Sequence, residues 1–205
     1  MIVYVESNFV LELALNQEQS KFARKILKQA KQRKVDLAIP AYGLAEPAWT
    51  LRNREQRREN LLREMSTDVR ELGRSKARSD LTAALMSHIK ILRTAGEEDH
   101  RKYDEVVRTL LGCARVLDLT VETLREALRV RKKLLVTRHD SYILGSILTD
   151  LRKSRRSAGE VRLFISRDTK LGKQEISDEF RKFDCRIIPD FKSSYDFIAS
   201  ASSSK

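Results

Sequence analysis

The chain begins with a four-residue apolar run, Ile2 to Val5, that stops at Glu6 and gives way to a helix-like pattern from about Phe9. A run that is apolar at every position is typical of a strand buried on both faces, as in parallel sheets flanked by helices. Open α/β folds of this kind build their ligand sites outside the carboxyl ends of the strands. Glu6 therefore either belongs to such a site or simply caps the helix that follows it.

Three further acids occur in comparable settings. Glu46 lies on a helix-like stretch that follows an apolar strand ending at Pro40, Asp140 heads an apolar helix, and Asp168 comes just after a strand over residues 161–165. Because two of the four acids directly follow strands, we expect all four to converge at one end of a sheet. Carboxylates gathered in this way repel one another strongly unless a divalent cation lies among them.

Four stretches, VYVESN, IPAYGLAEPAWTL, RHDSYILGSIL and LFISRD, resemble in this order the PIN-domain family of metal-dependent ribonucleases. The resemblance covers the chain up to about Glu46 and again from Thr137 to the end. It is greatest for the branch that includes the ribonuclease toxins of bacterial toxin–antitoxin pairs. It implies a three-layer α/β/α sandwich with a short central parallel sheet, extended in this chain by a long helical insert, and it implies a metal-dependent endoribonuclease.

The same resemblance assigns roles to individual side chains. It makes Glu6, Glu46, Asp140 and Asp168 the catalytic, metal-binding acids, with Asn8 and Ser166 as supporting polar groups near the first and last of them. The implied ion is Mg²⁺ or Mn²⁺, which prefers oxygen ligands and keeps several waters, so two to four carboxylates are sufficient protein ligands. A bound ion lowers the pKa of its water and polarises the scissile phosphate, so hydrolysis needs no side-chain nucleophile.

Two departures from the family pattern leave a second function open beside the nuclease. Glu6 stands where the family usually has Asp, which adds a methylene and shifts the carboxylate outward. Near the fourth acid, related sequences often carry an Asn followed three residues later by Asp and Phe, whereas SRDTKLG offers only Asp168. The alternative is therefore a catalytically weak or inactive PIN-like module that binds RNA or protein.

The charge balance favours a polyanionic partner. The formal net charge is +12, and an excess of Lys and Arg around an acidic site supplies the attraction that RNA binding requires. The basic residues form local clusters, which we interpret either as RNA contacts or as solvated helix faces. The two clusters assigned to RNA are Arg129, Arg131, Lys132 and Lys133, and Arg152, Lys153, Arg155 and Arg156; a third comprises Arg74, Lys76 and Arg78.

The segment from about 52 to 136 has an almost entirely helical and heavily charged pattern, with apolar stripes at helical spacing. A break is expected at residues 94–97, around Gly96. We expect the stripes to form the layer that covers one face of the sheet. The alternative is a pair of long helices that projects as an arm, for a homodimer contact, an antitoxin-like inhibitory protein or an RNA platform.

The remaining sequence predicts a single domain over residues 1–200, which includes this insert, and a flexible tail over 201–205. CRIIP is interpreted as a final edge strand and SSYDFIAS as a closing helix. Cys113 and Cys185 lie in apolar contexts, which indicates core thiols in a reducing compartment. Because no signal-peptide pattern and no run of ~18 apolar residues occurs, we expect a cytoplasmic protein without a membrane partner.

Overall fold

Five parallel strands form the centre of the molecule, in the order β3-β2-β1-β4-β5. They are β1 (Ile2–Val5), β2 (Asp36–Pro40), β3 (Arg115–Leu117), β4 (Arg162–Ile165) and β5 (Cys185–Ile188). The structure is a computed structural model, and it describes residues 1–154 and 160–203. β1 lies at the centre of the sheet, with Ile2 level with Asp36 and with Arg162, and all its residues are buried because helices cover both faces.

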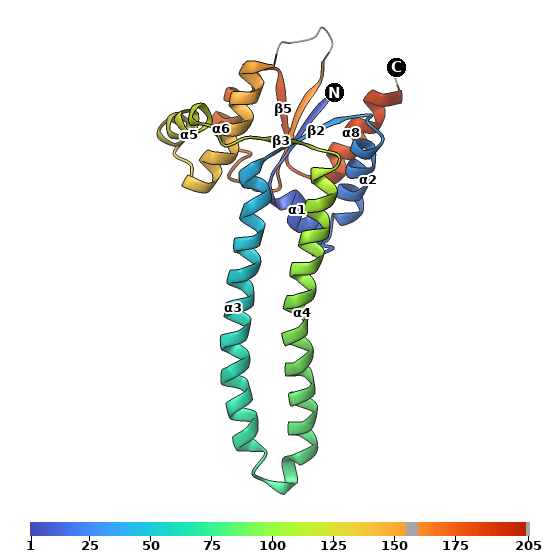
Figure 1. Ribbon diagram of the computed structural model, residues 1–205, viewed down its shortest axis with the longest axis vertical. Coiled ribbons are helices and arrows are strands. Elements are labelled where there is room, and N and C mark those ends of the chain that lie inside the picture. The colour runs from blue at the N-terminus through green and yellow to red at the C-terminus, as the bar shows by residue number, and fades with distance from the viewer. Residues whose placement is uncertain (155–159, 204–205) are drawn as a thin grey trace.

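Alternate residues of the strands pack into two halves of the core. Val3 and Val5 face a layer of helices α1, α2 and α8, whereas Ile2 and Tyr4 face helices α5, α6 and α7 on the other side. The helices are α1 (Ser7–Ala14), α2 (Ser20–Lys31), α5 (Val121–Leu134), α6 (Arg138–Lys153), α7 (Gln174–Arg181) and α8 (Phe191–Ser203). The predicted three-layer α/β/α fold class is therefore confirmed (Figure 1).

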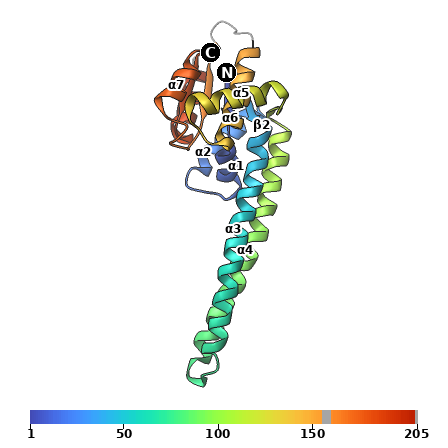
Figure 2. The same ribbon diagram turned by 90° about the vertical axis from the view of Figure 1, so that its left-hand side faces the viewer.

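Two long helices leave the sandwich together as a hairpin. They are α3 (Ala41–Leu72) and α4 (Ser79–Leu111), joined by a turn that contains the short 3₁₀-helix η1 (Lys76–Arg78). Their ends near the sheet pack against α1, and the rest projects far beyond the domain in both views (Figures 1 and 2). We call residues 55–100 of this hairpin the arm. The expectation that the apolar stripes cover a sheet face is wrong for the arm, and the alternative of a projecting helix pair is what the structure shows.

The expected break around Gly96 is also absent, since α4 continues through it. A Cβ at Gly96 would lie 3.2 Å from Oε1 of Glu55 and 3.4 Å from Nη1 of Arg58, both on α3. The glycine therefore allows the two helices to approach closely rather than ending one of them. The chain reverses instead at residues 73–78, where the apolar spacing lapses.

Three boundaries differ from those expected. β3 lies inside the segment assigned to the insert, and it pairs with β2 at the edge of the sheet. α5 also lies there, yet it packs on α6 in the sandwich, beginning at Thr120, whose Oγ1 accepts a hydrogen bond from the N–H of Thr123 at 3.2 Å. α8 continues to Ser203, into the expected tail, of which residues 204–205 lie outside the described part.

Two smaller findings concern the cysteines and the membrane. Cys113 and Cys185 are both free thiols, and Cys185 is buried in the core beneath α7. Across residues 1–154 and 160–203, no helix has both the length and the apolar character needed to cross a membrane.

Candidate functional site

Four acids line one pocket at the carboxyl edge of the sheet. Glu6 directly follows β1, Asp168 follows β4, Glu46 lies near the start of α3 just after β2, and Asp140 lies in the first turn of α6. Neighbouring parallel strands end at the same edge, so the segments that follow them are brought together there. The pocket, of about 210 Å³, thus gathers every acid that the sequence singles out.

Glu6 is the buried member of this group, with only 3% of its surface exposed. Its Oε2 accepts a hydrogen bond of 2.8 Å from the N–H of Asn8, so Glu6 does cap α1. Its Oε1 is buried and has no hydrogen-bond partner among the described residues. Burial raises the pKa of Glu6 to about 7, and the charge of Glu46 adds to this, against the opposing hydrogen bonds from Asn8 and Ser166. A buried carboxylate with a free oxygen is costly unless a proton or a cation satisfies it.

Glu46 and Asp140 are each held by a hydroxyl group. The hydroxyl of Ser7 donates to Oε2 of Glu46, whose Oε1 lies 3.7 Å from Nδ1 of His139. Oγ1 of Thr137 donates to Oδ2 of Asp140 at 2.7 Å and accepts from the Asp140 N–H at 3.2 Å, which begins α6. These contacts fix one oxygen of each carboxylate.

Ser166 lies between the first and the last acid. It is buried, its Oγ accepts a hydrogen bond of 3.1 Å from the N–H of Asp168, and its hydroxyl also lowers the pKa of Glu6. Oδ1 of Asp168 is held in turn by the N–H of Lys170 at 2.8 Å. The structure therefore places Asn8 and Ser166 beside the acids to which the sequence assigns them.

The acids surround the pocket without closing on one point. Within the described ranges, no three His, Cys, Asp or Glu side chains are close enough to hold one ion together. Arg54 and Thr50, which the sequence analysis does not identify, also line the pocket. They follow Glu46 on α3 at steps of four residues, a spacing that places all three on one face of a helix. That spacing is the signal that could have identified them.

An aromatic rim borders the pocket on the side of α6. The ring of Tyr42 packs edge-on against Tyr142, with centroids 5.2 Å apart, and its hydroxyl is hydrogen-bonded to Nδ1 of His139. Burial and then the charge of Glu46 raise the pKa of Tyr42. Trp49 stands three residues after Glu46 on α3, and 61% of its surface is exposed. Trp49 is not among the residues that line the pocket, but a large exposed aromatic on the helix that carries Glu46 is a suitable surface for stacking a base.

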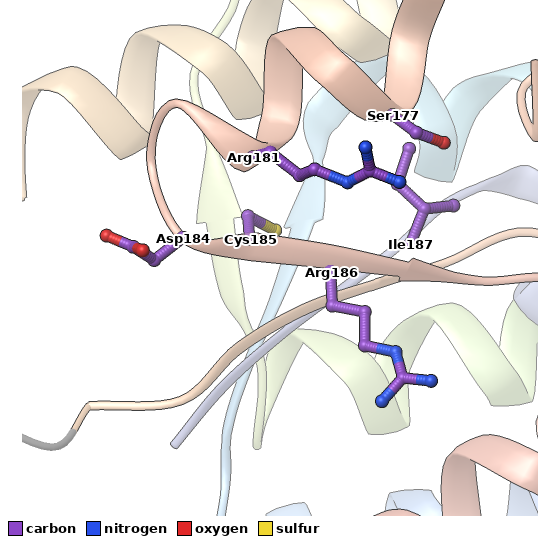
Figure 3. A pocket seen from close by; sticks show the side chains of 6 residues that line it. All are labelled: Ser177, Arg181, Asp184, Cys185, Arg186 and Ile187. Carbon is purple, nitrogen blue, oxygen red and sulfur yellow. The ribbon is translucent and has the colours of Figure 1, made fainter. Parts of the chain in front are cut away.

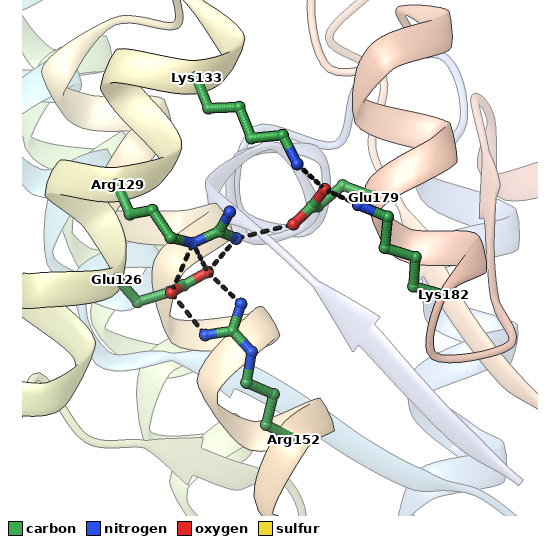
Figure 4. Close-up of polar contacts among 6 residues, drawn as sticks. All are labelled: Glu126, Arg129, Lys133, Arg152, Glu179 and Lys182. Atoms are coloured by element: carbon green, nitrogen blue, oxygen red, sulfur yellow. Dashed lines mark hydrogen bonds and ion pairs between the residues drawn. The ribbon is translucent and has the colours of Figure 1, made fainter.

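Three members of the clusters assigned to RNA bind buried acids. The carboxylate of Glu126 binds Arg129 and Arg152, and the carboxylate of Glu179 binds Arg129, Lys133 and Lys182 (Figure 4). Both acids are buried, so these cations neutralise charge inside the contact of α5, α6 and α7. Burial alone would raise the pKa of Glu179, but the hydrogen bonds from Lys133, Lys182 and Arg129 lower it to about 2.

The other members of these clusters differ in their surroundings. Nζ of Lys153 is paired with Glu122 at 2.6 Å. Arg131 and Lys132 are exposed and form no ion pair within the described structure, so they remain available to a ligand. Arg155 and Arg156 lie outside the described residues. Arg129, Lys133 and Arg152 already bind buried acids, yet their side chains are partly exposed, so their assignment to RNA stays a prediction.

A separate hollow of about 560 Å³ lies beside β5 (Figure 3). Its lining comprises Ser177, Arg181, Asp184, Cys185, Arg186 and Ile187. It opens near Cys185, at the amino end of β5, whereas the acids gather at the carboxyl ends of the strands. Burial raises the pKa of the Cys185 thiol to about 12, so this group is not a nucleophile near neutral pH. The acid pocket is therefore the better candidate for chemistry.

The chain matches no protein-family model and no curated protein sequence. Among solved structures it is similar to the crystal structure of VapBC2 from Rickettsia felis bound to a DNA fragment from their promoter. The two share 12% sequence identity with a TM-score of 0.47, over 92% of this chain and 98% of that chain. A likeness this remote carries no inference about chemistry, which depends on the geometry of the acid pocket.

Proposed function

We propose that this protein is a PIN-like, metal-dependent endoribonuclease that hydrolyses phosphodiester bonds in single-stranded RNA. The observation that carries the proposal is the convergence of Glu6, Glu46, Asp140 and Asp168 from four separate segments on one pocket at the carboxyl edge of a parallel sheet. So many carboxylates close together repel one another, which destabilises the metal-free fold. A divalent cation among them would replace this repulsion by attraction.

The donor atoms of the pocket are carboxylate oxygens, the type that a hard divalent cation binds. Glu6 offers a buried oxygen without a partner, and the other acids each contribute oxygen atoms around the same space. These four side chains would hold Mg²⁺ or Mn²⁺, with waters completing the coordination. The bound ion would supply an activated water and neutralise charge that develops on the phosphate.

The surrounding side chains have distinct tasks in this proposal. Ser7, Thr137 and Ser166 fix the acids or the backbone beside them, as their hydrogen bonds show. Arg54 would contact a phosphate oxygen of the substrate, since a guanidinium matches that geometry. Trp49 would stack on an unpaired base beside the cleaved bond, which favours single-stranded over double-stranded RNA.

RNA is thus the proposed partner, and an antitoxin-like inhibitory protein would be a second partner if the enzyme acts as a toxin. The second candidate function is a catalytically weak or inactive PIN-like module that binds RNA or protein. It is favoured by the spacing of the acids, since no three are close enough to hold one ion together within the described ranges. Arg54 beside the acids would serve RNA binding in either case.

Cleavage of single-stranded RNA tests the two candidates. The enzyme proposal expects cleavage with Mg²⁺ or Mn²⁺, none with chelator, and at least a hundredfold loss in Asp140→Asn with an unchanged melting profile. Asp80→Asn is the matched control, since Asp80 also lies in the first turn of a helix, α4, but at the far end of the arm. Cleavage that survives both the chelator and Asp140→Asn would refute the metal mechanism, and RNA binding without cleavage would favour the module.

A further inference from the structure

The far half of the arm exposes more apolar side chains than it buries. Its buried core consists of Leu62, Val69 and Ile89, with Leu85 packed against them. The exposed large residues are Leu61, Met65 and Leu72 on α3 and Leu81, Met86, Ile91 and Leu92 on α4, with exposures between 36% and 62%. A helix pair with so small a core gains little from its own contacts, so a covering layer would stabilise it.

Most of these exposed residues lie on one side of the arm. On α3, Leu61, Met65 and Leu72 directly precede Leu62, Ser66 and Gly73 at the contact with α4. On α4, Leu81 directly precedes the buried Thr82, the partly buried Leu85 follows Leu81 by four residues, and Leu92 follows Leu85 by seven. In an antiparallel pair, residues that precede the contact positions of each helix lie on the same side of the pair. We call these six residues, Leu61, Met65, Leu72, Leu81, Leu85 and Leu92, the distal apolar face.

The distal apolar face is continuous along the arm. Gly73 lies against Thr82 and Gly96 against Glu55, which fixes the levels of the two helices. Leu61 is then about level with Leu92, and Leu72 with Leu81, so the face extends for roughly 17 Å along the helices. Asp68 and His88 stand within it near its middle and are both exposed.

Charge is distributed unequally along the same arm. The turn and the residues beside it are basic, with Arg70, Arg74, Lys76 and Arg78 against Glu71 and Asp80. On the other side of the distal apolar face acids outnumber bases, with Glu97, Glu98 and Asp99 in succession on α4 and Glu55 and Glu59 on α3 against Arg57, Arg58 and Arg93. Some of these acids pair with cations of the same two helices, as Asp99 does with Arg58 and Glu98 with Lys102, and the exposed pair of Glu98 contributes little.

We infer that the distal apolar face binds the same face of a second copy of this chain, with the two arms antiparallel in a four-helix bundle. A two-fold contact between identical patches closes on itself. An antiparallel overlap centred near His88 brings Arg78 of one copy level with Glu97 of the other, because each lies about ten residues from His88 along α4. A parallel overlap would instead place the two basic turns side by side. Charge therefore selects the antiparallel arrangement.

The first experiment measures mass by analytical ultracentrifugation over a range of concentrations. The unmodified chain should sediment as a dimer, whereas Leu61→Glu combined with Leu92→Glu should halve the mass by weakening the dimer on the order of a hundredfold. Met86→Glu is the matched control, since Met86 is exposed on the other side of the helix contact and should leave the dimer intact. Circular dichroism checks that the variants keep their helices.

The second experiment determines the direction of the arms by cysteine cross-linking, in a chain carrying Cys113→Ser. His88→Cys should form a disulfide between copies under mild oxidation, and Ser75→Cys at the turn should not. An unmodified chain that stays monomeric at all concentrations would overturn the proposal, as would a dimer that survives both Leu→Glu changes. Cross-linking through Ser75→Cys alone would overturn the antiparallel arrangement. Because mass and cross-links are measured without RNA or metal, the result does not depend on nuclease activity.

Discussion

At the scale of single residues, the side chain of Glu6 both caps a helix and contributes a buried oxygen to the acid pocket. One carboxylate oxygen begins α1 by accepting the N–H of Asn8, and the other is buried without a partner at the acid pocket. The cap holds the side chain in place, and the unpartnered oxygen makes its charge costly. The sequence suggested these two interpretations as alternatives, and the capping role is confirmed. The catalytic role stays a prediction.

The pKa of Glu6 gives the metal-free protein a specific pH dependence. A folded-state pKa of about 7, above the ordinary value of 4.5, means that the folded protein keeps a proton which the unfolded chain loses. The contribution of Glu6 to the unfolding free energy should therefore be fully present below pH 4.5 and fall as pH rises toward and through 7, by up to about 3 kcal/mol. Urea denaturation in chelator between pH 5 and 8 measures this. Glu6→Gln should remove most of the slope, and Glu64→Gln, on the exposed surface of the arm, should keep it.

Trp49 provides a direct test of substrate binding, because it is the single tryptophan of the chain. If bases stack on it, single-stranded RNA should quench its fluorescence in the presence of chelator, and double-stranded RNA of equal length should quench it far less. Trp49→Ala should weaken RNA binding by about 1–3 kcal/mol, and Trp49→Phe should restore part of it. Equal quenching by both forms of RNA would exclude stacking on an unpaired base.

At the scale of secondary-structure elements, the sequence predicted those elements that have a distinct local pattern of apolar residues. β1 is apolar throughout, and β2 and β4 are apolar after a charged first residue, so the acids that follow them could be placed together because parallel strands end at one edge. β3 was not predicted because it is only three residues long, two of them partly buried, and interrupts a helical pattern. Arg54 was not predicted because its position at the pocket depends on α3 continuing past Pro47. The ion pair between Arg129 and Glu179 was not predicted because the two residues lie 50 positions apart in sequence.

Glu179 should contribute measurably to the contact between α5 and α7. It is buried against Arg129, Lys133 and Lys182, and Glu179→Gln would leave these three cations facing one another. We expect a loss of about 1–3 kcal/mol of unfolding free energy, discounted because the cations are partly exposed. Since the pKa of Glu179 is lowered to about 2, this stabilisation should be present above about pH 4.5 and be lost as pH falls toward 2. Thermal melts at pH 7 and 3 would show a smaller difference between variant and parent at pH 3.

At the scale of the whole molecule, the structure consists of a sandwich with two core halves and an arm with a small core of its own. The sequence could not distinguish an arm from a covering layer, because the stripe of Leu61, Leu62, Met65, Val69 and Leu72 mixes buried with exposed positions. Only the position of α4 decides that Leu62 and Val69 are the buried pair. Apolar spacing predicts the helices but not the partner they pack against.

The separate cores predict that the arm can be removed without unfolding the sandwich. Replacing residues 55–100 by a short Gly/Ser linker should leave a cooperative thermal transition and metal-dependent cleavage of short RNA, because Glu46 and Arg54 lie outside the deleted segment. The same deletion should abolish the dimer. A sandwich that no longer melts cooperatively would show that the arm is part of the folding unit.

The continuity of α3 has a mechanical consequence. This one helix carries Glu46 near its first turn and leads to the basic turn at its other end, roughly 40 Å away, so it connects the two rigidly. Pro47, next to Glu46, lacks the N–H that would complete the helical hydrogen bonds at this position. The helix should therefore bend most easily there. A displacement of the distal end of α3, whether by a second copy or by another molecule, would therefore bend the helix at Pro47 and shift the carboxylate of Glu46.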